Sequence, residues 1–276
     1  MRVPARVRLL APPLAWIGVF YVVPLLLILA VSFVSRGAYG GVSWTPNWGN
    51  YGRIFDSLYG AVFFRSIVLS TAATAACALL AFPVSWWMAR SPKRSQETLL
   101  LLVLIPFWTN ILVRLYAWMF LLSGAGLLNS ALQALGLTRG PVDILYTRGA
   151  ILLGLLYGNL PLMILPLYAS LERIDKSLLE AARDLYASPA QTLFRVILPL
   201  AKPGLAAGCI LVFTSALCDF ATPDLLGGAK NMLVGNLIQQ QYLVARDWPF
   251  GSALSLTQML VIGGGLLLFR RLEKAA

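Results

Sequence analysis

The sequence predicts an all-α integral membrane protein with six transmembrane helices. Hydrophobic residues make up 59% of the 276 residues and charged residues only 12%, whereas a soluble domain carries about a quarter charged residues. The mean hydropathy is +0.76. The apolar residues gather in six stretches that are nearly free of charge, and a spanning helix needs roughly 20 such residues. These observations exclude a soluble enzyme, a disordered chain and a secreted disulfide scaffold.

The expected spans follow from the charge-free stretches. They are residues 10–35, 63–88, 98–122, 149–171, 203–224 and 250–269. The apolar run of the first span is longer than the roughly 7–15 residues of a signal peptide, so we interpret it as a retained anchor helix. Pro12, Pro13 and Pro24 predict that this helix starts late and bends. No other segment is large enough to fold separately, so residues 1–276 are expected to form a single transmembrane domain.

The basic residues predict the orientation of the chain in the membrane. Fourteen of the 22 Lys and Arg residues fall on the side of the two termini, seven fall on the other side, and Arg114 lies within a span. Lys and Arg accumulate on the cytoplasmic side of membrane proteins, so both termini are expected in the cytoplasm. This distribution accounts for the net charge of +11 and argues against a nucleic-acid partner, because no basic stripe is continuous.

The residue types that are missing limit the chemistry. The chain has no His, and its three cysteines, Cys77, Cys209 and Cys218, lie in apolar runs without a CxxC pair. We therefore expect no catalytic residues and no metal site. There is also no GxxxxGK[ST] phosphate-binding loop, so the chain is not expected to bind ATP or to be an enzyme.

The cytoplasmic loop of residues 172–202 carries two helix-start patterns. Ser177 followed by Glu180 is a capping-box pattern that predicts a short helix from about Leu178. Ser188 followed by a proline and then Gln191 repeats the pattern. The loop is therefore expected to contain two short helices that meet next to Ser188.

The first of these helices is predicted to be amphipathic. The apolar face consists of Leu178, Leu179, Ala182 and Leu185. The polar face consists of Glu180, Arg183 and Asp184. Such a helix either lies on the bilayer surface or docks into a groove on a cytoplasmic partner. The balanced charge favours the partner, because surface-bound helices are usually rich in Lys and Arg.

The same loop resembles a known motif. Glu180-Ala181-Ala182, followed by Ala187, Phe194, Ile197, Leu198-Pro199 and Pro203-Gly204, is similar to the EAA motif of permease subunits in bacterial ABC importers. The resemblance implies a type I permease fold and a coupling helix that docks on an ATP-hydrolysing subunit. It assigns this coupling role to Glu180, Ala181, Ala182, Asp184, Tyr186, Ala187 and Ser188.

Tyr186 departs from the motif, which has Gly at this position. Gly would allow a tight turn, whereas Tyr requires either an ordinary backbone conformation or local strain. Either the turn relies on the Ser188 segment instead, or Tyr186 is itself a contact residue.

Four further segments are similar to the permeases of spermidine/putrescine importers. They are residues 106–118, 160–175, 219–230 and 247–251. The resemblance implies a polyamine importer in the bacterial inner membrane that works by alternating access. Its partners would be a second permease subunit, identical or different, a cytoplasmic dimer of ATP-binding subunits that holds ATP and Mg²⁺, and a periplasmic or extracellular solute-binding protein. The alternatives are another small solute or a transporter that works alone, although the inverted repeats typical of such transporters are not visible.

Two charges are expected inside the spans, where a charge marks a functional candidate. Arg114 and Asp219 each lie about 15 residues from the inner end of their span, or roughly 22 Å up. Either they form a structural ion pair, or Asp219 attracts a cationic solute together with Asp224 at the mouth.

Nearby residues complete the candidate solute path. Trp108, Tyr116 and Trp118 either form cation–π contacts with a polyamine or pack against neighbouring helices. Asn159 either lines a cavity or forms a hydrogen bond between helices.

Overall fold

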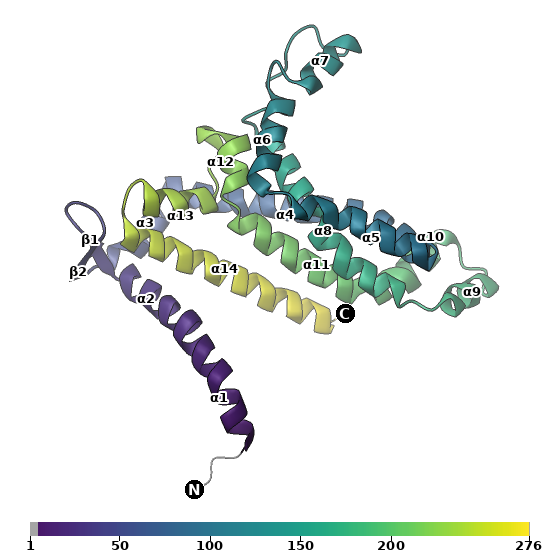
Figure 1. Cartoon of the computed structure of the whole chain (residues 1–276), viewed down its shortest axis with the longest axis horizontal. Coiled ribbons are helices and arrows are strands. Elements are labelled where there is room, and N and C mark those ends of the chain that lie inside the picture. Colours follow the sequence, from purple (N-terminus) through teal and green to yellow (C-terminus); the bar gives the residue numbers. More distant parts are fainter. Residues whose placement is uncertain (1–4, 276) are drawn as a thin grey trace. The chain divides into compact units, whose positions relative to one another are not determined.

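The computed structural model describes the backbone of residues 5–275 and the side chains of residues 10 and 12–267. Within these residues the chain forms two compact units, whose helices and strands are labelled in Figure 1. The terminal unit comprises the stretch up to Val62 together with Leu237–Leu268, and the central unit comprises Phe63–Asn236.

The terminal unit is mainly helical but includes one hairpin. Its elements are α1 (Ala5–Ile17), a π-helical turn (Gly18–Val22), α2 (Val23–Ser32), β1 (Val34–Arg36), β2 (Val42–Pro46), α3 (Gly49–Ile54), most of α13 (Val234–Leu243) and most of α14 (Trp248–Ala275). The strands are antiparallel, and Gly40 and Gly41 form the turn at positive φ, which Gly adopts without a steric penalty. In the described part of the chain, this hairpin is the one departure from the predicted all-α class.

The helix that leads into the first span starts earlier than its prolines predict, at Ala5. Pro12 and Pro13 lie inside α1, and Pro24 lies in the first turn of α2, directly after the π-helical turn. A helix accommodates a proline without breaking when the hydrogen bonds around it change register, and the π-helical turn is such a change. The expected late start is therefore wrong.

The central unit is built on two long helices, α8 (Arg148–Glu172) and α11 (Leu198–Cys218), packed against each other. Its other elements are α4 (Ser57–Arg90), which starts in the terminal unit, α5 (Lys93–Trp108), α6 (Ile111–Leu122), α7 (Leu127–Ala134), α9 (Lys176–Asp184), α10 (Pro189–Thr192), a π-helical turn (Leu193–Ile197), α12 (Ala221–Gly227) and a 3₁₀ turn (Ala229–Asn231).

Small residues allow α8 and α11 to approach closely. A Cβ atom on Gly208 would lie 2.5 Å from the sulfur of Met163, and one on Gly204 would clash with the carbonyl oxygen of Pro166. Small residues at helix contacts are typical of membrane proteins, where close packing rather than apolar burial drives association. The core around this contact also includes Cys77, Ala81, Met88, Leu167, Leu171, Ala201 and Val212.

Six helical segments of the described chain are long and apolar enough to cross a membrane, which confirms the predicted number. They are Pro12–Ser32, Ser57–Arg90, Ile111–Ala134, Arg148–Glu172, Pro189–Cys218 and Trp248–Leu267. The basic residues of both termini, Arg2, Arg6, Arg8, Arg270, Arg271 and Lys274, lie outside the described side chains. The orientation and the single domain of residues 1–276 stay predictions.

The third predicted span, residues 98–122, is wrong as one helix. The backbone leaves the helix after Trp108 and is extended at Thr109, and a new helix, α6, starts at Ile111. The side chain of Asn110 accepts a hydrogen bond from the Leu112 N–H at 2.8 Å and so caps α6. The prediction counted apolar residues and missed this cap.

The fifth predicted span, residues 203–224, is also wrong at both ends. Helix α11 starts at Leu198 and ends at Cys218, and Asp219 has an extended backbone. Asp219 therefore lies in the link between α11 and α12, rather than within a continuous helix.

Candidate functional site

The EAA-like segment forms α9, and its N-terminus is capped two residues earlier than predicted. Asp175 is the N-cap, and its carboxylate accepts a hydrogen bond from the Ser177 N–H at 3.0 Å. This bond lowers the pKa of the exposed Asp175 carboxyl. The predicted Ser177 cap and the start at Leu178 are therefore wrong, because an Asp two residues earlier satisfies the first free N–H groups.

The C-terminus of α9 ends in a left-handed turn at Tyr186, whose φ is +55°. The Tyr186 N–H donates to the Arg183 carbonyl at 2.8 Å, and the Ala187 N–H donates to the Ala182 carbonyl at 3.0 Å. This pair of bonds is the Schellman motif, which usually has Gly at the left-handed position. Of the two predicted alternatives, an ordinary or a strained backbone, Tyr186 therefore adopts the strained one. The residue is 96% exposed.

The second capping box is confirmed. The Ser188 N–H donates to the Gln191 side chain at 2.9 Å, and the Gln191 N–H donates to the Ser188 hydroxyl at 3.3 Å. A π-helical turn follows, in which the Leu198 N–H reaches back to the Leu193 carbonyl. Pro199, which has no N–H to donate, comes next. The predicted pair of short helices next to Ser188 is correct.

The apolar face of α9 divides into a packed part and an exposed part. Ala182 is buried and Leu179 packs against the core of the central unit, whereas Leu178 and Leu185 are exposed. Glu180, Ala181, Asp184 and Ser188 are also exposed and Ala187 is half-buried. The segment therefore presents a mixed apolar and charged surface on a helix that is capped at both ends.

A cavity of about 600 Å³ lies in the central unit between the α5–α6 junction, α8 and the α11–α12 junction. Three of the predicted path residues, Arg114, Asn159 and Asp219, line this cavity. The other four do not line it. They are Trp108, Tyr116 and Asp224, which are exposed, and Trp118, which contacts the edge of the Tyr157 ring.

Asp219 caps α12. One carboxylate oxygen accepts hydrogen bonds from the N–H groups of Ala221 at 2.9 Å and Thr222 at 3.1 Å. The other oxygen accepts the Thr222 hydroxyl. Both oxygens of Asp219 are thus engaged by the first turn of the helix that follows.

Arg114 lines the same cavity without contacting Asp219. None of its nitrogens lies within the 4.0 Å that defines an ion pair, so the ion-pair alternative is not formed in this structure. Nε and Nη1 are buried and have no hydrogen-bond partner among the described residues. The guanidinium lies 5.8 Å from the Tyr157 ring and 6.0 Å from the Phe107 ring.

Asn159 is buried, and its amide donates to the Leu155 carbonyl of the same helix at 2.7 Å. The cavity-lining alternative therefore describes its position. Sequence reasoning missed Phe107, Tyr157 and Phe220, which also line the cavity. Gly154 and Gly158, which flank Tyr157 one helical turn apart, were a sequence signal for a close helix contact at this point. In the structure Gly154 lies against Thr222 and Leu226 of α12.

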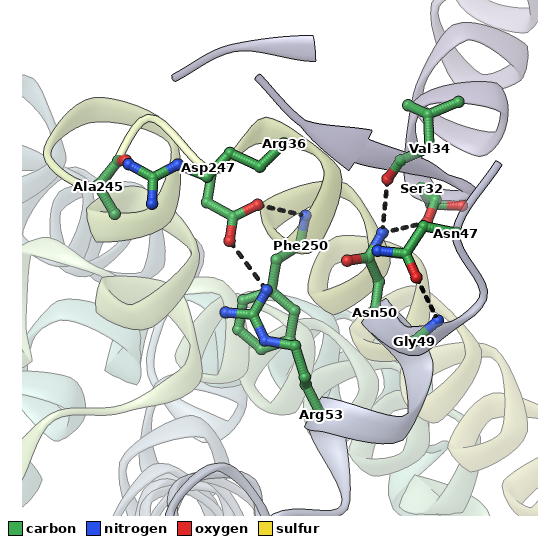
Figure 2. Close-up of polar contacts among 10 residues, drawn as sticks. All are labelled: Ser32, Val34, Arg36, Asn47, Gly49, Asn50, Arg53, Ala245, Asp247 and Phe250. Atoms are coloured by element: carbon green, nitrogen blue, oxygen red, sulfur yellow. Dashed lines mark hydrogen bonds and ion pairs between the residues drawn. The ribbon is translucent and has the colours of Figure 1, made fainter. Parts of the chain in front are cut away.

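The terminal unit contains a second arginine and aspartate set, which sequence reasoning also missed (Figure 2). Arg53 of α3 donates to the Asp247 carboxylate at 2.9 Å, and its guanidinium lies 3.9 Å from the centre of the Phe250 ring. The other Asp247 oxygen accepts the Phe250 N–H at 3.2 Å and so caps α14. Burial lowers the pKa of Arg53, but the bond and charge of Asp247 outweigh it, and the net shift is upward.

Further hydrogen bonds hold the hairpin to the segment before α14. The Arg36 side chain donates to the Ala245 carbonyl at 2.7 Å (Figure 2), and the Gly41 N–H donates to the Arg246 carbonyl at 2.8 Å. The buried Asn50 amide donates to the carbonyls of Ser32 and Val34. These bonds tie the hairpin, α3 and the start of α14 into one body.

Comparison with known proteins identifies one matching family and several similar permeases. Residues 81–274 match the family described as binding-protein-dependent transport system inner membrane component. The spermidine/putrescine transport system permease protein PotB of Escherichia coli K12 is 44% identical over 259 residues, which cover 94% of each chain. The PotB protein of Haemophilus influenzae is 42% identical over 94% of this chain and 91% of its own. The inner membrane ABC transporter permease YdcU of E. coli is 36% identical over 96% and 88%.

A solved structure has the same fold. A chain of the bacterial alginate ABC transporter, in complex with an alginate pentasaccharide-bound periplasmic protein, superposes with a TM-score of 0.79. The match covers 97% of this chain and 94% of the other at 16% identity. This likeness confirms the predicted importer permease fold. The chain therefore belongs to the family of inner membrane components of binding-protein-dependent transport systems and is a multi-pass permease subunit of an ABC importer.

Proposed function

We propose that this permease imports polyamines, spermidine or putrescine, across the bacterial inner membrane, with both of its termini in the cytoplasm. The observation that carries the proposal is the 44% identity to the spermidine/putrescine permease of E. coli along 94% of both chains. The aligned region therefore includes the segments that line the cavity as well as those that form the scaffold.

The importer would contain four kinds of component. This chain would pair with a second permease, identical or different, above a cytoplasmic dimer of ATP-binding subunits that holds ATP and Mg²⁺. A periplasmic solute-binding protein would deliver the polyamine, and the periplasmic protein in the structural relative supports this arrangement. ATP hydrolysis belongs to the partner subunits, since this chain has no phosphate-binding loop.

Coupling to ATP is assigned to α9 and the turn after it. We propose that Glu180, Ala181, Ala182, Asp184, Tyr186, Ala187 and Ser188 form the contact with the ATP-binding subunit. The exposed side chains of Leu178, Leu185 and Tyr186 would fill a groove on that subunit. Because α9 is capped at both ends, movement of the partner would be transmitted to the core through Ala182 and Leu179 as a rigid body.

The solute path is assigned to the cavity of the central unit. Protonated amines bind carboxylates by charge-assisted hydrogen bonds and aromatic faces by cation–π attraction. Asp219 supplies a carboxylate and Phe107 and Tyr157 supply aromatic faces around one space, which the amide of Asn159 also lines. Alternating access would open this space to each side of the membrane in turn.

The test is ATP-driven uptake in proteoliposomes that contain the assembled importer and its binding protein. Wild-type importer should accumulate labelled spermidine or putrescine only with ATP inside. Glu180→Lys should reduce this uptake more than about tenfold, the effect of losing a few kcal/mol of coupling contact. Glu97→Lys, an exposed glutamate of α5 outside the EAA-like segment, is the matched control and should stay within about twofold.

Two results would contradict the proposal. Accumulation of another solute but of no polyamine would overturn the substrate. Normal ATP-driven uptake with Glu180→Lys would overturn the coupling assignment.

A further inference from the structure

The cavity of the central unit holds a positive charge without a partner. Arg114 and Asp219 are its two charged lining residues, and Asp219 directs both oxygens to the first turn of α12. Arg114 therefore gains no ion pair inside the cavity, and two of its nitrogens are buried without a hydrogen bond to a described residue. An unpaired buried charge is costly, and Arg114 carries this charge at the wall of the cavity.

The aromatic walls of the cavity already face a cation. The Arg114 guanidinium lies about equally far from the Tyr157 and Phe107 rings, at 5.8 Å and 6.0 Å, which is at the limit of cation–π attraction. Those two rings are the faces that a protonated amine entering the cavity would use. The resident guanidinium and an incoming ammonium group therefore compete for the same walls and repel each other.

We propose that Arg114 is a built-in competitor of the cationic solute, which keeps binding in the cavity weak enough for release. The inference rests on the proposed polyamine function and deepens it by naming a specificity-determining residue. Repulsion from Arg114 grows with the number of ammonium groups on the solute. Spermidine, which has one more such group than putrescine, is therefore opposed more strongly.

The test is equilibrium binding of labelled spermidine and putrescine to the assembled importer in lipid nanodiscs, without nucleotide and without the binding protein. Arg114→Met keeps most of the side-chain length and removes the charge. It should lower the spermidine Kd on the order of tenfold, or ~1.4 kcal/mol, and the putrescine Kd by a smaller factor. Arg114→Lys keeps the charge and should bind both solutes like wild type.

Arg90→Met is the matched control. The Arg90 guanidinium also lies over an aromatic ring, 4.4 Å from the centre of Trp86, and two of its nitrogens also lack a hydrogen-bond partner within the described part of the chain. Arg90 does not line the cavity, so its removal should leave both Kd values within about twofold, the usual scale of a distant substitution. Arg114→Gln, which is neutral and polar, repeats the test if Arg114→Met fails to assemble with its partners.

The outcomes separate the two proposals. Unchanged or weaker spermidine binding by an assembled neutral Arg114 variant, or equal tightening for both solutes, overturns the competitor role while polyamine uptake by wild type stands. A wild-type importer that neither binds nor transports polyamines overturns the proposed function, and the competitor role with it.

Discussion

Arg53 with Asp247 and Arg114 with Asp219 are built from the same side chains but arranged differently. In both sets the aspartate caps a helix and the arginine faces an aromatic ring. Asp247 uses one oxygen as the cap and offers the other to Arg53 at 2.9 Å. Asp219 gives its second oxygen to the Thr222 hydroxyl instead. The second oxygen of Asp219 thus accepts a hydroxyl of the same helix turn, whereas that of Asp247 accepts an arginine from another helix.

The difference separates a structural role from the proposed transport role. The Arg53–Asp247 pair joins α3 to the start of α14, and such a pair stabilises only while it stays closed. The Arg114 guanidinium has no ion pair to break, so it is available to respond to a solute. The predictions below test whether the two sets differ in energy as they do in geometry.

The largest effect is expected from breaking the locked pair. Asp247→Ala should lower the free energy of unfolding by about 2–3 kcal/mol, because it removes a helix cap and leaves Arg53 without its partner. This is below the full range for buried pairs, since 42% of the Arg53 side chain is exposed. The change in the free energy of unfolding is measured by denaturation in detergent micelles. The control, Asp56→Ala, removes an exposed carboxylate and should change stability by less than about 0.5 kcal/mol.

Double-mutant cycles compare the two sets directly. Replacement of Arg53 and Asp247, singly and together, should give a coupling energy of about 1–2 kcal/mol. The same cycle for Arg114 and Asp219 should give less than about 0.3 kcal/mol, because the two side chains are not in contact. Equal coupling energies in the two cycles would refute the distinction.

Thr222→Val should allow Arg114 and Asp219 to form an ion pair, as Arg53 and Asp247 do. Loss of the hydroxyl removes one hydrogen bond to Asp219, which should lower the free energy of unfolding by about 1 kcal/mol. The freed oxygen becomes available to Arg114, so the coupling energy of Arg114 and Asp219 should rise to about 1 kcal/mol in this background. A coupling energy that stays near zero would show that Thr222 is not what keeps the two apart.

The smallest effect concerns alkaline pH. The folded-state pKa of Arg53 is raised, so its contribution to stability is complete below the unfolded pKa and is lost only as pH rises through the folded value. The stability difference between wild type and Arg53→Met should therefore stay constant from about pH 7 to about pH 10. Unfolding measured across this window checks it, and a steady decline would mean that Arg53 titrates far below its ordinary range.

Apolar runs and caps made most of the fold predictable. Six charge-free stretches predicted six spans, and the Ser188 and Gln191 pattern predicted the second short helix correctly. The two spans that were predicted with wrong boundaries each contain a polar residue that caps a new helix. Asn110 splits the third span and Asp219 ends the fifth, because each side chain satisfies the N–H groups of a new helix. A count of apolar residues does not detect such caps.

The candidate site was predictable in part. Arg114, Asn159 and Asp219 were identified because polar groups within spans are rare, and they do line one cavity. Phe107 and Tyr157 were missed because aromatic residues are common in membrane helices and carry no such signal. The Arg53–Asp247 contact joins residues 194 positions apart, a separation that a single sequence without a repeat does not connect. Tyr186 adopts the left-handed backbone conformation, and its residue type alone left both this conformation and an ordinary one open.

The most direct test of the account asks whether the cavity lies on the solute path. A Ser215→Cys variant, with Cys77, Cys209 and Cys218 replaced, places one thiol at the cavity wall. Its reaction with a cationic methanethiosulfonate reagent is followed in the reconstituted importer. Spermidine at about ten times its Kd should slow the reaction about tenfold, while Ser57→Cys, exposed at the start of α4, should react at an unchanged rate. Full reactivity of Ser215→Cys in an importer that still transports spermidine would contradict the account.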